Sequence, residues 1–262
     1  MNLLNRVAFS IFGVDIYFYG LIIGLGVLAC LITAIILCKV KKIDTSYALE
    51  TFLTILPSGI LGARLFSVIF EDGLTILDFF NFRTGGMSII GAVIGGAIGI
   101  LVYMLIKKKP FLFIADIVTS VLMLGQSVGR WGNYFNNEVY GLQVTNPDLQ
   151  FFPFAVNING AWYEALFFYE SVLTLIGFIV VLIVYLKTKK TGIATASYFT
   201  YYGLIRLILE TRRQPEFILK WGNVPVSMLI AGVFMLVGIA IFVYLIIKNK
   251  KENSLGRKEI HK

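Results

Sequence analysis

Long apolar runs dominate this chain, and short polar connections separate them. Each of seven runs is close to the roughly 20 residues that a helix needs to cross the hydrocarbon core of a bilayer. The runs cover residues 16–38, 47–70, 86–106, 111–128, 165–186, 193–210 and 224–247. The pattern therefore predicts an all-α, polytopic membrane protein with about seven transmembrane helices.

Lysines follow the first, third, fifth and seventh of these runs. They form clusters at residues 39–42, 107–109, 187–190 and 248–251. Alternate connections of a multi-span protein lie on one side of the membrane, and the positive-inside rule makes the lysine-rich side cytoplasmic. We therefore expect the N-terminus outside, a cytoplasmic tail at residues 248–262, and a single integral membrane domain over residues 1–262.

Composition supports this class of protein and excludes others. The chain is 58% hydrophobic and contains 22 Phe and 13 Tyr, unlike an ordinary soluble domain. Its net charge of +8 is mostly the lysine pattern, which suits an anionic inner leaflet and gives no sign of nucleic-acid binding. The only histidine is His261 in the tail, and Cys30 and Cys38 lie in the first run. We expect no metal site, no cofactor and no histidine-based triad.

Glycines recur every fourth residue in several places along the chain. This spacing more often marks close helix packing than a ligand site. The glycines concerned are Gly20 and Gly24, then Gly91, Gly95 and Gly99, and finally Gly125 and Gly129.

The densest group of polar side chains follows the fourth run, where residues 129–141 read G-R-W-G-N-Y-F-N-N-E-V-Y-G. The guanidinium of Arg130 is a permanent cation whose fork of donors suits a phosphate or carboxylate. Side chains that can hold it in place are Asn133, Asn136, Asn137 and Glu138. We predict a loop at the membrane boundary, with glycines that let the backbone turn and approach a ligand. A helix-capping loop that meets lipid headgroups would explain the same pattern.

A second polar group lies in the sixth run. Tyr202, Arg206, Glu210 and Arg213 are spaced so that they share one face of a helix. An arginine inside a span costs about 2.5 to 3.5 kcal/mol on insertion scales, so such residues are functional candidates. A purely structural Arg206–Glu210 ion pair is the alternative interpretation.

The basic residues on the expected outer side are nearly all arginines. They are Arg83, Arg130, Arg212 and Arg213, together with Lys220. Topology does not explain arginines away from the cytoplasm, although interfacial anchoring accounts for some of them.

The longest segment without a predicted helix, residues 140–162, also falls on the outer side. Its prolines, asparagines and phenylalanines indicate an ordered amphipathic loop, which we interpret as a lid or a partner-docking surface. Glu170, near the outer end of the fifth run, needs a cationic partner, and Arg64 in the second run is the candidate.

Residues 129–141 resemble the signature of the phosphatidylglycerol:prolipoprotein diacylglyceryl transferases. Residues 202–213, Y-G-L-I-R-L-I-L-E-T-R-R, resemble the second arginine helix of that family. Shorter matches are Tyr19-Gly20, P-S-G-I-L-G-A-R-L at 57–65, G-G-M-S at 85–88 and F-Y-E-S at 168–171. Two positions depart from the family pattern. Ile90 stands where many members have histidine or tyrosine, and E-A-L-F-F precedes Tyr169 where a His-Pro start is common.

The resemblance implies an enzyme of the bacterial cytoplasmic membrane with its active site toward the outer face. The family moves the diacylglyceryl group of phosphatidylglycerol onto the lipobox cysteine of a prolipoprotein signal peptide and releases glycerol 1-phosphate. Arg130 would hold the lipid phosphate, with support from Asn133 and Glu138, and Arg206 would help. The full set of candidate catalytic residues is Arg130, Arg206, Glu210, Tyr19 and Tyr202, and the candidate substrate-binding residues are Arg130, Asn133, Asn136, Glu138 and Arg213.

The substrate thiol, with an ordinary pKa of about 8.5, must lose its proton before it attacks. Ile90 cannot accept that proton. The candidate acceptors are Glu210, Glu138, Tyr19 and Tyr202, and a nearby arginine that lowers the thiol pKa is the alternative.

Two other classes of function remain open. One is a divergent relative that binds phospholipid without this catalysis, or that modifies a different acceptor, and Ile90 favours it. The other is a small transporter or channel for an organic anion. Against a transporter, the arginines cluster on the expected outer side without a matching series through the membrane.

Overall fold

The computed structural model describes residues 7–70, 73, 75–81, 86–218, 220–222 and 224–260. Arg83, Gly85 and His261, named above, lie outside these residues. The long helices of the described chain are α1 (Phe18–Val40), α2 (Ser46–Phe70), α3 (Ile89–Lys107), α4 (Phe111–Asn136), α5 (Leu166–Lys187), α6 (Ile193–Glu210) and α7 (Val226–Ile260). Short 3-10 helices are η1 (Ile76–Phe80), η3 (Pro147–Leu149) and η4 (Pro215–Phe217).

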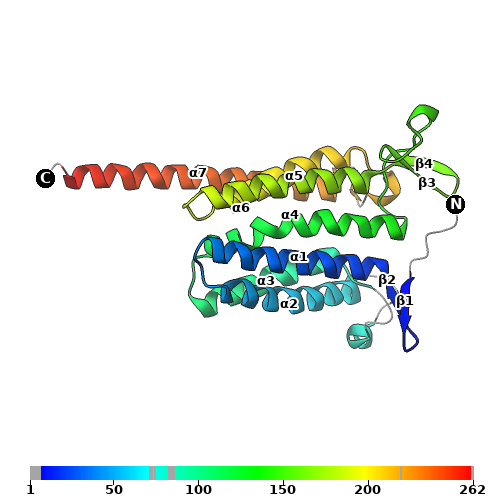
Figure 1. Ribbon diagram of the computed structural model, residues 1–262, viewed down its shortest axis with the longest axis horizontal. Helices are drawn as coiled ribbons and strands as arrows, with labels where there is room; N and C mark the ends of the chain where they lie inside the picture. The colour runs from blue at the N-terminus through cyan, green and yellow to red at the C-terminus, as the bar shows by residue number, and fades with distance from the viewer. Residues whose placement is uncertain are drawn as a thin grey trace. The chain divides into compact units, whose positions relative to one another are not determined.

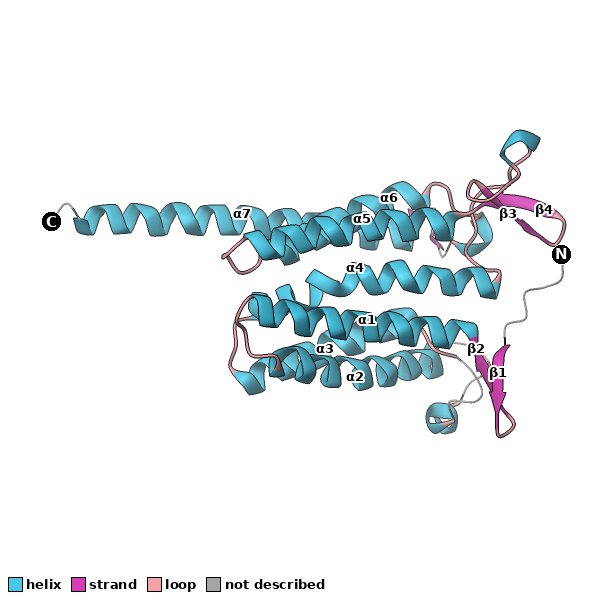
Figure 2. Cartoon of the chain, in the orientation of Figure 1, coloured by secondary structure: helices cyan, strands magenta, loops and turns pink. Residues whose placement is uncertain are grey.

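The strands make three short antiparallel hairpins beside the helix ends (Figure 2). They are β1 (Val7–Ile11) with β2 (Val14–Tyr17), β3 (Ala155–Ile158) with β4 (Ala161–Glu164), and β5 (Lys220–Trp221) with β6 (Val224–Pro225). These hairpins are additions to the predicted all-α fold, and the helices remain its main structure.

Six helices of the described chain are long and apolar enough to cross a membrane, which agrees with a polytopic membrane protein, whereas the count of about seven spans stays a prediction. The remaining long helix, α6, has the predicted bounds but is less apolar, because it carries Arg206, Glu210 and several hydroxyl side chains. The other predicted helices agree closely with the structure, apart from the ends of α4 and α7, which both extend further.

The polar segment after residue 128 was expected to form a loop, and over residues 129–136 this prediction is wrong. Helix α4 continues without a break to Asn136. Gly129 and Gly132 do not turn the chain, and a Cβ added to Gly132 would lie 2.7 Å from the ring of Tyr19 in α1. The polar residues stay helical because they find partners inside the protein, so the apolar run ends before the helix does.

The chain divides into two compact units, Ala34–Val118 and Met1–Thr33 with Thr119–Lys262. Helices α1 and α4 each contribute residues to both units. In the first unit, α2 packs tightly against α3 through glycines. A Cβ on Gly95 would lie 2.9 Å from the Cα of Gly62, and one on Gly91 would overlap the carbonyl group of Gly62. Close packing at Gly91 and Gly95 is thus confirmed.

Arg64 of α2 is fully buried in the Ala34–Val118 unit. Its guanidinium donates hydrogen bonds to the carbonyl oxygens of Asp78, Asn81 and Gly86, at 3.1, 2.7 and 3.0 Å. These contacts hold η1, together with Asn81 and Gly86, against α2. Arg64 therefore stabilises the connection between the two helices.

In the other unit, α5, α6 and α7 lie side by side (Figure 1). Gly203 of α6 lies so close to α7 that an added Cβ would be 2.7 Å from the carbonyl oxygen of Ala231. A serine pair joins α4 to α5, since the Ser127 hydroxyl donates to the Ser171 carbonyl oxygen at 2.8 Å. This packing fixes the relative rotation of the four helices.

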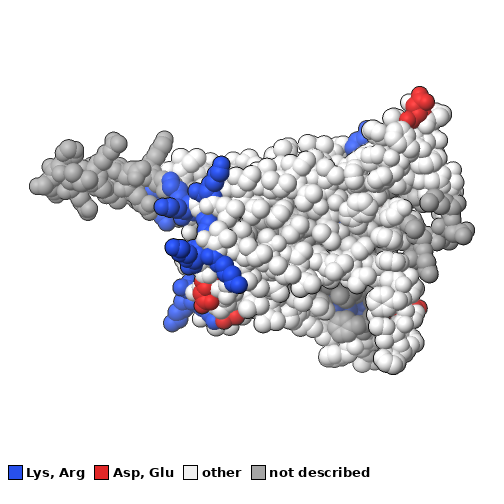
Figure 3. Space-filling model, viewed as in Figure 1, with Lys and Arg blue, Asp and Glu red and all other residues white. Residues whose placement is uncertain are grey.

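Basic side chains gather at one end of the helices in each unit (Figure 3). Lys39, Lys107 and Lys187 occupy the last turns of α1, α3 and α5. The lysines that follow the first, third and fifth apolar runs of the sequence therefore lie at the ends of helices in the structure.

The glycine contacts yield a test of helix packing. Gly95→Ala places a methyl group against the backbone of α2, and we expect the free energy of unfolding to fall by about 1 to 3 kcal/mol. Gly24→Ala is the matched control, because a Cβ there meets no atom within 4 Å. Thermal unfolding in detergent measures both, and an equal loss in the two variants would contradict the packing role of Gly95.

Candidate functional site

Three connections, which follow α4, precede α5 and follow α6, are hydrogen-bonded to one another. Backbone bonds run from Gly141 to Glu164 at 3.0 Å and from Val144 to Trp162 at 2.8 Å, so the segment after α4 lies along the β3–β4 hairpin. Gly141 also bridges to Arg213, which follows α6. The hairpin precedes α5 directly, so these contacts bring the ends of the three helices together.

Tyr140 reinforces this junction. Its hydroxyl donates to Glu216 in η4 at 2.8 Å, and its ring packs against Phe217. Burial and the hydrogen bond to Glu216 raise the pKa of Tyr140 to about 12. The phenol therefore stays protonated and continues to donate at physiological pH.

The carboxylate of Glu170 lies at the centre of the site. It is 1% exposed in α5 and contacts two arginines that come from neighbouring helices. Nη2 of Arg130 in α4 lies 2.6 Å from Oε1 of Glu170. Nη1 of Arg206 in α6 lies 3.0 Å from Oε1 and 3.1 Å from Oε2. Glu170 thus joins the two predicted arginines, and both are its partners in place of the Arg64 favoured from the sequence.

A second buried carboxylate, Glu210, extends this group along α6. Its Oε2 lies 3.7 Å from Nη2 of Arg206 and 3.5 Å from Nη1 of Arg213. The hydroxyl of Ser227 in α7 donates to its Oε1. The expected Arg206–Glu210 pair therefore exists, although Arg206 contacts Glu170 more closely.

Together these residues form an alternating row of charges, Arg130, Glu170, Arg206, Glu210 and Arg213, which we call the arginine–glutamate row. It contains three cations and two anions, and its side chains are at most 20% exposed. Burying charge is costly unless each charge has an opposite partner. The row meets this condition and retains one excess positive charge, which favours an anionic ligand.

The other predicted residues surround the start of this row less directly. Asn133 is buried in α4, and Asn136 donates to Glu138 at 3.3 Å. Glu138 lies between Asn137 and Val139, whose φ angles of 52° and 58° turn the chain sharply after the helix. Tyr19 packs its ring over Gly132, two residues beyond Arg130, and is 38% exposed.

Tyr202 belongs to a neighbouring polar contact between α6 and α4. Its ring stacks on Tyr198 with centroids 5.8 Å apart. The hydroxyl of Tyr198 in turn accepts a hydrogen bond from Gln126 at 2.9 Å. The predicted face of α6 is therefore confirmed as an interior face, with Tyr202 one turn before Arg206.

Glu170 and Ser227 are the principal residues that sequence reasoning did not place in the site. Glu170 was singled out as a carboxylate that needs a partner, and it also falls in the F-Y-E-S match. Ser227 gave no signal, because a serine at the start of an apolar run is common. Only the packing of α7 against α6 brings it to Glu210.

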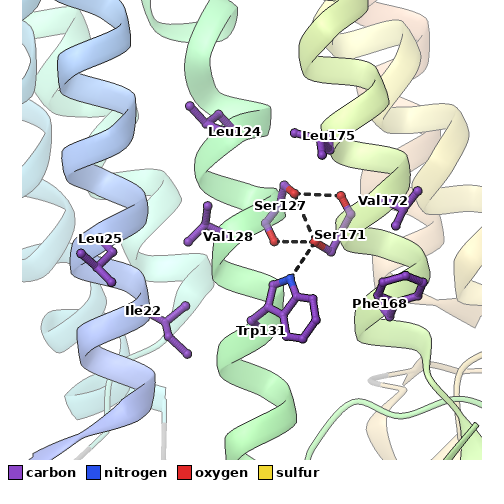
Figure 4. Close-up of a pocket in the computed structure, with 10 residues that line it drawn as sticks. All are labelled: Ile22, Leu25, Leu124, Ser127, Val128, Trp131, Phe168, Ser171, Val172 and Leu175. Carbon is purple, nitrogen blue, oxygen red and sulfur yellow. Dashed lines mark hydrogen bonds between the residues drawn. The ribbon is translucent and has the colours of Figure 1, made fainter. Parts of the chain in front are cut away.

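An apolar cavity of about 440 Å³ lies between α1, α4 and α5 (Figure 4). It is lined by Ile22, Leu25, Leu124, Ser127, Val128, Trp131, Phe168, Ser171, Val172 and Leu175. Trp131 and Ser171 directly follow Arg130 and Glu170 in the chain, and the indole of Trp131 donates to the Ser171 hydroxyl at 3.1 Å. The cavity and the arginine–glutamate row thus use consecutive residues of α4 and of α5, although no residue of the row lines the cavity.

These features define an integral membrane protein with a buried cationic site beside an apolar cavity, which suits an amphiphilic anion. Residues 6–244 match the sequence profile of the prolipoprotein diacylglyceryl transferases. The chain is 37% identical over 259 residues to a phosphatidylglycerol–prolipoprotein diacylglyceryl transferase of Clostridium botulinum (strain Hall), covering 95% of this chain and 99% of the relative.

Two further relatives carry the same description. Transferase 1 of Clostridium perfringens is 34% identical over 257 residues, which cover 95% of this chain and 97% of the relative. The protein of Clostridium kluyveri is 34% identical over 249 residues, which cover 92% and 97%. The chain therefore belongs to the prolipoprotein diacylglyceryl transferase family.

The central position of Glu170 gives a stability prediction. Glu170→Gln leaves two buried guanidinium groups without their shared counter-charge, and we expect the free energy of unfolding to fall by about 3 to 5 kcal/mol. Denaturation of the purified protein in detergent measures the loss.

Glu164→Gln is the matched control for this variant. Glu164 pairs with Arg212, whose side chain is 54% exposed, so we expect a loss of about 1 kcal/mol or less. Similar losses in both variants would contradict the central role of Glu170 in the row.

Proposed function

We propose that this chain transfers the diacylglyceryl group of phosphatidylglycerol to the lipobox cysteine of prolipoproteins and releases glycerol 1-phosphate. The observation that carries the proposal is the pairing of Arg130 and Arg206 across Glu170, beside an apolar cavity, in a chain of this family. Such a site can bind both the phosphate and an acyl chain of a phospholipid.

Arg130 and Arg206 are the groups that hold the lipid phosphate in this proposal. A guanidinium has five N–H donors, more than the contacts with Glu170 use, and it binds phosphate through two donors at once. Because Glu170 fixes both arginines from different helices, their positions are set before the substrate arrives. Groups fixed in this way stabilise developing charge without the cost of reorganisation.

The reaction is a displacement at carbon. The cysteine sulfur forms a C–S bond to the terminal glyceryl carbon, and the bond between that carbon and the phosphate oxygen breaks. Negative charge then moves from the thiolate to the leaving glycerol 1-phosphate. The two arginines favour this step because they lie where the leaving group gains charge.

The thiol proton must pass to an acceptor before or during this displacement. Glu210 is 3% exposed and is held by Ser227 and two arginines, a position suited to orienting those arginines. Tyr19 and Glu138 are more exposed and lie at the Arg130 end of the row. We therefore propose that one of these two receives the proton.

The apolar cavity is suited to an acyl chain of the lipid. Its walls come mainly from leucine, isoleucine, valine and aromatic side chains, and one of them, Trp131, follows Arg130 in α4. A phospholipid carries its phosphate next to its acyl chains, so the two sites are arranged as the substrate requires.

We place the site at the outer face of the bacterial cytoplasmic membrane, with the N-terminus outside and the C-terminus inside. Support comes from the alternation of basic residues along the chain. Lysines lie in the last turns of α1, α3 and α5, and the arginines lie near the other helix ends. In this orientation the β3–β4 hairpin faces the prolipoprotein. Phe151, Phe152 and Phe154 are each roughly half exposed and form an apolar surface for a signal peptide.

A second candidate function is a phospholipid-binding relative that does not perform this transfer. Ile90 in the first turn of α3 favours it, because this side chain cannot exchange a proton. The transfer reaction itself separates the two functions.

We expect purified protein to add a diacylglyceryl group to a lipobox peptide when phosphatidylglycerol is supplied, as measured by mass spectrometry. Arg130→Ala or Arg206→Ala should lower the rate roughly 100- to 1000-fold, because each removes charge stabilisation from the leaving group. Arg212→Ala is the matched control, since Arg212 is exposed and pairs with Glu164. It should retain the wild-type rate.

Two outcomes would contradict the proposal. Lipid binding without any mass increase in the wild type would favour the phospholipid-binding relative. Equal losses in Arg130→Ala and Arg212→Ala would show that the buried arginines have no special part in the reaction.

The orientation can be tested by cysteine labelling in intact cells. Cys30 and Cys38 are buried, so they give little background with a membrane-impermeant maleimide. We expect Thr145→Cys, in the segment after α4, to react in intact cells. Lys189→Cys, in the connection between α5 and α6, should react only after the membrane is opened, and the reverse pattern would overturn the orientation.

A further inference from the structure

Lysines gather in the Ala34–Val118 unit where α1 and α3 end and α2 and α4 begin. They belong to the basic side chains at one end of the helices (Figure 3). Only two acidic side chains, Asp44 and Glu50, lie in the two connections and in the helix turns next to them. This excess of cations favours an anionic ligand. The lysines are Lys39, Lys41, Lys42, Lys107, Lys108 and Lys109.

Both of these carboxylates already have partners within the protein. Oε2 of Glu50 lies 2.6 Å from Nζ of Lys107, and the hydroxyl of Tyr103 donates to the same oxygen at 2.8 Å. Tyr103 is buried in α3, so it fixes the position of the carboxylate. Asp44 accepts a hydrogen bond from the backbone N–H of Ser46 at 2.9 Å, at the start of α2. Lys107 is thus the lysine that Glu50 neutralises.

Lys109 is held by an aromatic ring and not by a carboxylate. Its ammonium lies over the ring of Tyr47 in α2, 5.4 Å from the centroid. That ring makes a T-shaped contact with Phe113 of α4, with centroids 5.4 Å apart. A ring face attracts a cation but leaves its N–H donors free, and no ion pair of Lys109 occurs in the described part of the chain. The positive-inside rule explains a lysine at this end of the helices, but not its fixed place on a ring.

Exposed apolar side chains continue from these lysines along α2 and α3. Leu53 lies three residues after Glu50, and Leu105 and Ile106 directly precede Lys107. Each of the three is at least 70% exposed. Such side chains of a span contact lipid tails, which are as apolar as leucine. A ligand with an anionic headgroup and acyl chains therefore fits both the lysines and this surface.

We propose that Lys109, Tyr47 and the neighbouring lysines bind the headgroup of an anionic phospholipid that is not the substrate. Basic groups beside membrane helices are typical sites for such headgroups. Lys109 donates to the lipid phosphate, and Lys42 and Lys108 add positive charge from the same two connections. The lipid belongs to the cytoplasmic leaflet in the orientation proposed above, and the inference rests on the proposed function only for this choice of leaflet.

The length of α4 separates this lipid from the one bound at the arginine–glutamate row. Lys109 lies two residues before α4 begins at Phe111, whereas Arg130 lies near the other end of the same helix. At 1.5 Å per residue these positions are about 30 Å apart, roughly the thickness of the hydrocarbon core. A lipid at Lys109 contacts the connections on both sides of α2 and α3, so we expect it to stabilise this unit.

Two lipids with identical acyl chains test the site. Phosphatidylserine carries a net negative charge, whereas phosphatidylcholine has a zwitterionic headgroup with the same phosphate. Native mass spectrometry of the full chain in a neutral detergent, with equal amounts of both lipids, measures their relative binding. We expect the wild type to prefer phosphatidylserine. Lys109→Gln should lower this preference about fivefold, the usual contribution of one lysine near an anionic lipid.

Variants of Tyr47 separate a defined site from a general attraction between charges. Tyr47→Leu leaves every charge in place but removes the ring, and it should lower the preference about two- to fivefold. Tyr47→Phe keeps the ring face and should keep the wild-type preference. Lys189→Gln removes an exposed lysine from the connection between α5 and α6. It is the matched control for net charge and should also keep the preference.

Three outcomes would overturn the proposal. Equal losses in Lys109→Gln and Lys189→Gln would show that net charge alone governs the binding. An unchanged preference in Lys109→Gln or in Tyr47→Leu would show that the lipid binds elsewhere. Displacement of the lipid by inorganic phosphate would indicate a site for a free anion, because phosphate has no acyl chains to lie on α2 and α3. None of these measurements involves transfer to a peptide, so their failure leaves the transferase proposal intact.

Discussion

The neutralisation of buried charge around Glu170 is the constraint on which the site depends. Arginines 130 and 206 are each expensive within an apolar helix bundle, and neither has solvent enough to screen it. A single carboxylate between them compensates both, and it ties α4, α5 and α6 together at one level. The same contact that makes the arginines tolerable therefore also fixes the distance between them.

The serine contacts and the connections next to α4, α5 and α6 depend on this arrangement and support it. Ser127, about one turn before Arg130, joins α4 to Ser171, which directly follows Glu170 in α5. The hairpin before α5 is bonded to the segments after α4 and α6. Ser227 brings α7 into contact with Glu210. Polar groups thus hold the helices in position where apolar packing alone would permit sliding.

The excess of one positive charge gives the site its chemical direction. A row with equal numbers of cations and anions would need no ligand, whereas three arginines against two glutamates favour one more anion. The cavity beside Trp131 adds an apolar neighbour. A phospholipid supplies both an anion and an apolar chain, which is why a site of this type agrees with the family to which the chain belongs.

The sequence by itself determined the placement of the long helices along the chain, because apolar length sets what can cross a bilayer. It also indicated Arg130 and Arg206, since an arginine in such a chain stands out from its surroundings. Only the tertiary structure decided that α4 continues through the polar segment, that Glu170 joins both arginines, and that Ser227 orients Glu210. These outcomes depend on how helices distant in sequence rotate and pack, and the periodicity of a single helix carries no information on its neighbour's identity.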